Sequence, residues 1–433
     1  MNTVDSDRAE VTERLSAGHL PRLLLPRIWG GPASLTEHVA RHGLLPAVDR
    51  DARWRAECIA EVDRAGLTGR GGAGFPTARK LHAVATGRDV PVVIANGTEG
   101  EPASAKDKVL LAREPHLVLD GAVVAAEMIA ARRAIVVVHD AVREIVDDAV
   151  AQRRRARLDP VKIKIMTAAD GFVAGEASAL VNWVGRGVAL PTATPPRVSE
   201  RGLDGRPTLV QNAETLAHLA LIARHGARWF RSVGTPAEPG SMLVTIIGAV
   251  HRPGVYETEI GRPVSEVLGL AGGPAAALRA LLIGGYFGTW LESATAEPLP
   301  FSAAGLRAVG GSPGAGLVAA LPAGACGLAE TARVARYLAA ESAGQCGPCV
   351  FGLDSIAGEL DALAAGRRFD QARLRRWLGQ VDGRGACHHP DGAVHMIRSA
   401  LDVFATEIAR HARGWCCGTR PPGVLPVPSR TAP

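Results

Sequence analysis

The feature that most constrains this chain is a cysteine motif in its last quarter. Cys346 and Cys349 are separated by two residues, and a third cysteine, Cys387, follows further along the chain. Such spacing lets thiolates converge on one inorganic centre. Glycine and proline around the first two cysteines interrupt a helical pattern, so we expect these thiols on a loop between helices. The motif predicts a metal or iron–sulfur site and disfavours the alternative of two buried structural cysteines in a turn.

Length and composition predict several domains and no direct membrane insertion. A chain of 433 residues is too long for one hydrophobic core. The net charge of +6 is spread along the sequence, which does not indicate nucleic acid but fits an acidic protein partner. No apolar run is long enough for a membrane span, and the first residues lack the apolar core of a secretory signal. All cysteines but Cys58 follow residue 320, which is typical of cytoplasmic metal binding rather than a disulfide framework.

Hydrophobic periodicity predicts distinct units along the chain. Strand and helix patterns alternate from Val90 to Thr215, which is typical of a parallel sheet covered by helices. Within this part, the stretch from Val210 to Thr215 reads as the start of the closing helix. Paired strand patterns follow Gly240, and the pattern after about residue 325 is mainly helical. We therefore expect an N-terminal leader (1–50), an α/β domain (51–235), a β-grasp-like module (239–310), a helical domain (325–412) and a flexible tail (413–433).

A glycine-rich stretch, Gly66 to Thr77, leads into a predicted helix that carries Lys80. Glycines let backbone N–H groups approach an anion, the helix N-terminus favours negative charge, and the lysine adds a full positive charge. The spacing is neither the dinucleotide fingerprint nor a P-loop. The stretch predicts a phosphate-bearing ligand, with a plain turn before a helix as the alternative.

A second polar segment follows the predicted strand 90–95. Asn96, Glu99 and Glu101 come directly after it, where α/β sheets commonly bind ligands. The amide of Asn96 can bond a heterocycle, and the two carboxylates can accept from ribityl or ribose hydroxyls. A capped turn is the alternative.

Together these blocks resemble the flavin-bearing, NADH-oxidising subunit of respiratory NADH:quinone oxidoreductase and its relatives in bidirectional hydrogenases and NAD-linked formate dehydrogenases. The likeness covers about residues 55–410 in the same domain order. It implies a Rossmann-like FMN domain, a β-grasp module of the SLBB type and a helical bundle with an iron–sulfur cluster, 4Fe–4S or incomplete, with NADH as substrate. The residues that it implies for FMN are Gly69, Arg70, Gly71, Gly72, Lys80, Asn96, Glu99, Glu101, Gly175, Glu176, Asn212 and Thr215; those for the nucleotide are Phe75 and Arg197, and those for the cluster are Cys346, Cys349 and Cys387.

The chain departs from the family pattern at the cluster. Ala343 stands where the family motif has its first cysteine, which leaves three thiolates. The fourth ligand could be His388, a cysteine outside the motif or water, or the cluster could contain three irons or be absent. The cysteines in question are Cys326, Cys416 and Cys417.

The nucleotide side departs as well. Ala177 replaces one of the family's paired glutamates, and Ala83 and Arg197 replace phenylalanines that stack on adenine. Thr194 and Thr98 replace a lysine and an aspartate. These changes remove several contacts worth about 1 kcal/mol each. Arg197 could instead pair with a phosphate of a different nucleotide.

We predict a flavin and iron–sulfur electron-transfer protein, an NADH-dependent oxidoreductase that oxidises NADH or a related donor through FMN. Its expected partner is an electron-transfer protein, ferredoxin-like or a 2Fe–2S subunit, or a membrane reductase. Because the cofactors supply the chemistry, no side chain is predicted as nucleophile or general base. The alternative is a degenerate scaffold or binding protein that retains the fold, with or without FMN, and does not oxidise NADH.

Overall fold

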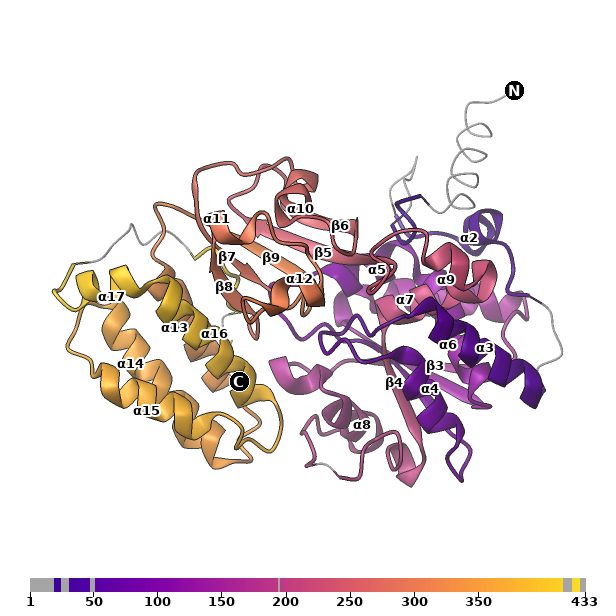
Figure 1. Cartoon of the computed structure of the whole chain (residues 1–433). Coiled ribbons are helices and arrows are strands. Elements are labelled where there is room, and N and C mark those ends of the chain that lie inside the picture. Colours follow the sequence, from indigo (N-terminus) through magenta and orange to yellow (C-terminus); the bar gives the residue numbers. More distant parts are fainter. Residues whose placement is uncertain (1–18, 25–30, 47–50, 194, 416–422, 429–433) are drawn as a thin grey trace.

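The computed structural model describes residues 19–24, 31–46, 51–193, 195–415 and 423–428. Figure 1 shows an α/β domain, a small mixed sheet beside it and a helical bundle at the opposite end. The sequence also predicts a polar helix at the start of the leader, which lies outside the described residues. The later leader helix, α2 (Leu35–His42), begins with a capping box between Ser34 and Glu37, as the sequence predicts.

The α/β domain is built on a four-stranded sheet with the order β3-β2-β1-β4, in which all neighbours are parallel. The prediction that residues 210–215 begin a helix is wrong at its start. Residues Thr208–Asn212 pair with β1 as the fourth strand, and the helix begins only at Ala213. The strands are β1 (Val92–Gly97), β2 (Arg133–Val138), β3 (Lys162–Thr167) and β4 (Thr208–Asn212).

Helices cover both faces of this sheet. Val93 and Ala95 of β1 pack into the larger core, whereas Val92 and Ile94 point to the opposite face and the smaller core. Because strand side chains alternate between faces, one apolar run serves both cores. The larger core includes α3 (Ala52–Ala65), α4 (Thr77–Ala85), α5 (Lys106–Arg113), α6 (Pro115–Met128), α7 (Arg143–Arg155) and α9 (Ala213–Phe230), and the smaller one α8 (Ala177–Arg186).

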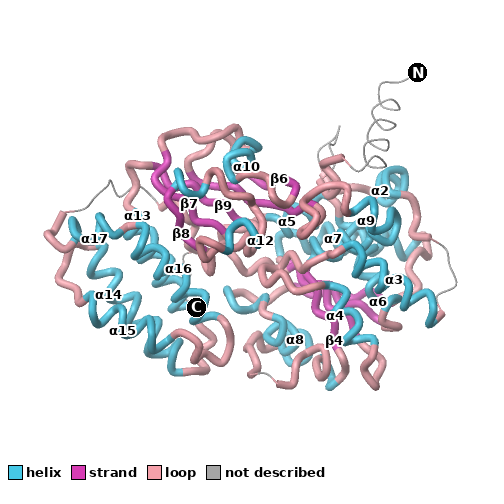
Figure 2. Tube along the Cα trace, viewed as in Figure 1, coloured by secondary structure: helices cyan, strands magenta, loops and turns pink. Residues whose placement is uncertain are grey.

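The middle unit is a five-stranded mixed sheet with the order β6-β5-β9-β7-β8, separate from the first sheet (Figure 2). Leu281, Ile283 and Val318 point to one face, where α10 packs, and Leu282 and Ala319 point to the other, toward the bundle. Its elements are β5 (Ser241–Gly248), β6 (Gly254–Glu259), α10 (Val264–Leu270), β7 (Leu278–Ile283), β8 (Thr289–Glu292), α11 (Ser293–Ala296), α12 (Ala303–Arg307) and β9 (Leu317–Pro322).

The C-terminal unit is helical, as predicted, with two differences. Residues Pro348–Leu353 form a π-helical turn, so Cys349 lies in a helix rather than a loop. The sequence pattern predicts one last helix from Ala393 to His411, but the structure breaks it at Phe404. The helices are α13 (Gly327–Ala340), α14 (Asp354–Ala364), α15 (Gln371–Val381), α16 (His389–Val403) and α17 (Ala405–His411).

One described part of the predicted flexible tail, residues 423–428, is docked. Leu425 is fully buried in the core of the bundle, and its N–H donates to Glu330 at 3.0 Å. The carbonyl of Pro426 accepts from the hydroxyl of Tyr286 in the middle unit. Apolar burial and satisfied backbone groups therefore fix this segment.

Among the described residues, none of the helices combines the length and apolar composition needed to cross a bilayer.

Candidate functional site

The glycine-rich loop is a hairpin with an open tip. Its base is closed by two bonds, from the N–H of Gly69 to the carbonyl of Phe75 and from the N–H of Thr77 to the carbonyl of Leu67, both 2.9 Å. Within the described chain, the N–H groups of residues 71–74 have no hydrogen-bond partner. Four consecutive donors without acceptors are suited to an anion.

Two glycines shape this tip. A Cβ at Gly71 would lie 3.3 Å from Cβ of Asn212, so the backbone packs directly on β4. Gly72 has φ +109, which disfavours any other residue. Its missing side chain faces Gly314 of the middle unit. The loop therefore lies between the first sheet and the middle unit.

Lys80 adds a positive charge next to this loop, in the second turn of α4. Its Nζ donates to the carbonyl of Val210 at 3.2 Å, and it forms no ion pair with a described carboxylate. Burial lowers the pKa of Lys80, because no described acid compensates for the lost hydration. An anionic ligand would provide that compensation.

The two asparagines lie at the carboxyl ends of neighbouring strands, where Asn96 is in register with Asn212. Both side chains also bond within the chain. Asn96 donates to the carbonyl of Gly175 at 2.9 Å and accepts from Thr98. Asn212 caps α9 and donates to Asp107 at 2.6 Å. Each therefore shapes the site, and its predicted contact with flavin stays a prediction.

Glu99 and Glu101 serve as anchors of the segment after β1. Glu99, at φ 47, accepts from the hydroxyl of Ser104 and from the N–H groups of residues 107 and 108. Glu101 accepts from the N–H of Tyr286 in the middle unit at 2.7 Å. Burial raises the pKa of Glu101 to about 7 and also raises that of Glu99.

Arg70 does not point to the open tip. Its guanidinium is buried and donates to the carbonyls of Thr68 and Ser241 at 3.2 Å each, while its N–H donates to the hydroxyl of Thr215 at 2.8 Å. Glu214 lies 3.9 Å from the guanidinium. The geometry gives Arg70 and Thr215 a structural role that holds the loop on α9.

The sequence did not single out the ion network beside Arg70. Lys106 lies 2.8 Å from Asp107 and 2.9 Å from Glu214, and all three are buried. Burial alone would lower the pKa of Lys106, but the two carboxylates outweigh it and raise that pKa. The signal in the sequence was the pair of adjacent charged residues, Lys106 and Asp107, at the start of the helix after Glu101.

Gly175 and Glu176 sit opposite the β1 segment. A Cβ at Gly175 would lie 2.7 Å from the hydroxyl oxygen of Thr98, so only glycine fits. Glu176 caps α8, accepting from the N–H groups of Ser178 and Ala179 at 2.9 Å. These bonds to the first turn of α8 hold the carboxylate of Glu176 in place without any ligand.

The predicted nucleotide residues lie on the surface. Phe75 is 39% exposed, and the guanidinium of Arg79 lies 5.6 Å from its ring. Arg197 is exposed in the loop after α8, and its carbonyl accepts from the N–H groups of residues 200 and 201. Among the described residues, no hydrogen bond, ion pair or ring contact joins Arg197 to Phe75.

The three cysteines come together between α13 and α16. Cys346 and Cys349 share a side-chain hydrogen bond, and the N–H of Ala386, next to Cys387, donates to Cys346. Among the described residues, no three histidine, cysteine or acidic side chains are placed to hold a single metal ion. A four-iron cluster spreads its iron atoms over a larger volume, so its ligands stand further apart. The three thiols would supply three of the ligands of such a cluster, and the methyl of Ala343 cannot provide the fourth.

These thiols have different proton affinities. Burial raises the pKa of Cys349 to about 12, and it also raises that of Cys387, helped by the nearby carboxylate of Glu176. Burial works in the same direction on Cys346, but bonds from Ala386 and Cys349 lower its pKa overall. Iron binds the deprotonated thiolate, so a positively charged iron atom would have to take the place of each of these protons.

Aromatic rings join the loop before Gly175 to the middle unit and the bundle. The ring of Phe172, which precedes Gly175, lies 4.8 Å from Phe287, 5.7 Å from His389 and 6.1 Å from Tyr337 by ring centroids. Its N–H donates at 2.9 Å to Glu341, just after α13. The loop that leads to Gly175 therefore touches both the middle unit and the cysteine end of the bundle.

Three family models match in this order. Residues 62–221 match the Nuo51 FMN-binding domain, residues 243–281 the SLBB domain, and residues 329–411 the NADH-ubiquinone oxidoreductase-F iron-sulfur binding region. The chain is 30% identical over 375 residues to the F 2 subunit of NADH-quinone oxidoreductase in Rhizobium meliloti, an alignment that covers 82% of this chain and 88% of the relative. This chain belongs to the family of NADH-quinone oxidoreductase F subunits.

Other relatives agree with this family. The F subunit of Streptomyces coelicolor is 29% identical over 386 residues, covering 83% of this chain and 84% of that protein. An NAD+-reducing [NiFe]-hydrogenase in its H2-reduced state has a TM-score of 0.77 and 29% identity, covering 95% of this chain and 73% of that chain. The predicted family and fold class are confirmed, with an FMN-binding α/β domain, an SLBB module and an iron–sulfur helical region. The family names also favour electron transfer over the scaffold alternative.

Proposed function

We propose that this chain oxidises NADH with FMN bound at the glycine hairpin and delivers the electrons through an iron–sulfur cluster in the helical bundle to a partner protein. The observation that carries the proposal is the unpaired donor set of residues 71–74 together with Lys80. The proposed units keep the limits 51–235, 239–310 and 325–412. The FMN and cluster residues proposed from the sequence are retained, with Arg70 and Thr215 supporting the hairpin.

When bound, FMN supplies acceptance of a hydride and release of single electrons. The chain supplies position and charge. The four amides and Lys80 offer donors to a phosphate, and the uncapped start of α4, where Pro76 offers no side-chain cap, adds the favourable end of a helix dipole. Gly71, Gly72 and Gly175 leave space where a Cβ would meet the chain or strain the backbone.

The nucleotide site is the more altered part. Phe75 is exposed and offers one ring face, while the guanidinium of Arg79 lies near the same ring. A cation above the ring competes with stacking on adenine but can also pair with a phosphate. NADH remains the proposed donor because the family relatives are named for it.

The proposed partner is an electron-transfer protein, ferredoxin-like or a 2Fe–2S subunit, with a membrane reductase as a further candidate. The relatives are named as subunits of larger enzymes, which supports a protein acceptor. A cytoplasmic location is part of the proposal and rests on the grouping of the cysteines near the cluster region.

An absorption spectrum of the anaerobic full chain, before and after adding NADH, tests this proposal. Flavin bands at about 450 nm that NADH bleaches are expected. Bound flavin that NADH leaves oxidised would favour the scaffold alternative. A chain that binds no FMN would contradict the proposed site itself.

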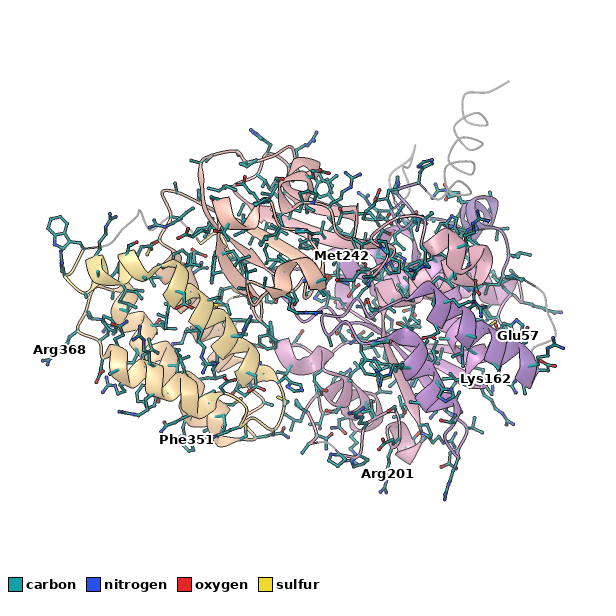
Figure 3. All side chains as sticks on the ribbon, viewed as in Figure 1. Glu57, Lys162, Arg201, Met242, Phe351 and Arg368 are labelled. Atoms are coloured by element: carbon teal, nitrogen blue, oxygen red, sulfur yellow. The ribbon has the colours of Figure 1, made fainter. Side chains whose placement is uncertain are left out.

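A Lys80→Met variant tests the hairpin separately. Loss of a charged donor to phosphate costs about 1.5–3 kcal/mol, so FMN affinity should fall about ten- to a hundredfold in a titration of flavin fluorescence. The matched control is Lys162→Met. Lys162 is exposed at the start of β3 (Figure 3), and β3 is the edge strand opposite to β4, which Lys80 contacts. Equal affinities of the two variants would contradict a role of Lys80 in phosphate binding.

A further inference from the structure

The iron–sulfur region lacks one cysteine. Residues 329–411 contain only Cys346, Cys349 and Cys387. A four-iron cluster held by the protein alone needs four ligands, which are usually thiolates. A further side chain is therefore needed to complete a four-iron site at the corner left by Ala343.

Two candidates from the sequence are excluded by their position. Cys326 caps the start of α13, and that helix of 14 residues separates it from Ala343 by about 20 Å. Its sulfur also lies 3.4 Å from Nε2 of His411. The side chain of His388 is fully exposed and faces Asp391. Cys416 and Cys417 lie outside the described residues.

His389 is placed differently. It is 3% exposed and follows Cys387 by two residues, and its backbone N–H donates to the Cys387 sulfur. Its Nε2 lies 2.8 Å from the carbonyl oxygen of Leu338, in the last turn of α13. Carbonyl groups of a helix point toward its C-terminus, so the ring lies off the end of α13, where the chain continues to Ala343.

The bond to Leu338 also fixes the ring's tautomer. A carbonyl only accepts, so Nε2 carries the proton and Nδ1 carries a free lone pair. Nδ1 of His389 is buried and has no hydrogen-bond partner in the described chain. A histidine that binds metal through one nitrogen typically donates the other N–H to a backbone carbonyl. A structural C-cap of α13 would explain Nε2 but would leave Nδ1 unsatisfied at a cost of about 1–3 kcal/mol.

We propose that Nδ1 of His389 is the fourth protein ligand of the iron–sulfur cluster, in place of the thiolate missing at position 343. The site then has three thiolates and one neutral imidazole. Compared with four thiolates, it carries one negative charge less. This inference rests on the proposed function only in assuming that a cluster is bound.

The experiment uses the anaerobic full chain with its cluster reconstituted from iron and sulfide. Pulsed electron paramagnetic resonance of the reduced protein should show a strongly coupled nitrogen, and 15N-labelled histidine should change that coupling. This measurement needs no substitution, so it remains informative if a variant fails to fold. A reduced cluster without coupled histidine nitrogen would overturn the proposal.

Variants provide a second readout. His389→Ala should lower the iron content from about four to about three per chain, and adding Ala343→Cys should restore about four without the nitrogen coupling. The exposed neighbour provides the control, so His388→Ala should keep both iron and coupling. Unchanged iron in His389→Ala would overturn the proposal, as would loss of one iron in a Cys416→Ser, Cys417→Ser double variant. Flavin bleaching by NADH needs no cluster, so failure here is distinct from failure of the proposed function.

Discussion

The carboxylate of Glu101 joins the α/β domain to the middle unit, and burial raises its pKa to about 7. The folded chain holds this proton up to about pH 7, whereas the unfolded chain releases it near 4.5. The stability that this bound proton gives the folded chain is complete below the pKa of Glu101 in the unfolded chain. It is lost as the pH rises through the pKa of Glu101 in the folded chain.

Glu101→Gln should remove this pH dependence. Between about pH 5 and about pH 8, the free energy of unfolding of the wild type should fall relative to the variant by up to about 3 kcal/mol. Urea unfolding of the flavin-free chain measures it. Glu292→Gln, at an exposed glutamate without a side-chain bond among the described residues, is the control and should follow the wild type. Parallel curves for Glu101→Gln and the wild type would contradict the assignment.

Residue types indicated an open glycine loop before α4 but not the direction of its side chains. Gly71, Gly72 and Lys80 were singled out because missing side chains and a nearby cation suit a phosphate, and their contact with FMN stays a prediction. Arg70 was expected at the ligand, yet it points into a buried network with Glu214. An asparagine such as Asn212, before a helix, reads equally as ligand contact and N-cap, so the sequence could not separate these roles.

The contact between α6 and α9 depends on one small residue. A Cβ at Gly121 would lie 1.9 Å from the carbonyl oxygen of Leu216, so Gly121→Ala must push the two helix backbones apart. We expect a loss of about 3 kcal/mol in the free energy of unfolding, measured by chemical denaturation. Gly269→Ala in α10 is the matched control, since nothing lies within 4 Å of its Cβ position. It should be neutral or stabilising by up to about 1 kcal/mol, and equal losses in both variants would refute the close-contact argument.

Elements with strong local patterns were predictable, and those that depend on distant partners were not. The alternation of strands and helices identified β1 to β3. Strand β4 is short and pairs only with β1, far earlier in the chain, so its sequence read as a helix start. The π-helical turn at Cys349 was missed because glycine and proline indicate a loop, whereas packing against α13 and α15 gives it a helical form.

The bond between Glu341 and the N–H of Phe172 joins the first and last units of the molecule. Glu341→Ala should increase hydrogen exchange of the amides of residues 172–175, because their tie to α13 is lost, and leave the amides of residues 69–74 unchanged. Ser342→Ala, at the neighbouring residue, is the control. Mass spectrometry measures this exchange. Equal exchange in the two variants would show that ring packing around Phe172 holds the loop without the bond to Glu341.

The order of the units was predictable, but their contacts were not. Composition and motif order indicated an α/β domain, a β-grasp-like module and a bundle. The return of residues 423–428 to the bundle and the ring contacts of Phe172 involve partners far apart in sequence. A proline-containing tail reads as loose until the cavity that receives Leu425 is known.

The position of β4 has a consequence for the protein during its synthesis. Strand β1 can pair with β2 soon after both leave the ribosome, but Val92 meets its partner Thr208 only more than a hundred residues later. At about 5–20 residues per second, the apolar edge of β1 stays open for several seconds. A nascent chain that ends before Thr208 therefore has a surface that can pair with a neighbouring chain. Completion of β4 ends this exposure, so the fourth strand protects the newborn protein from aggregation as well as shaping its ligand site.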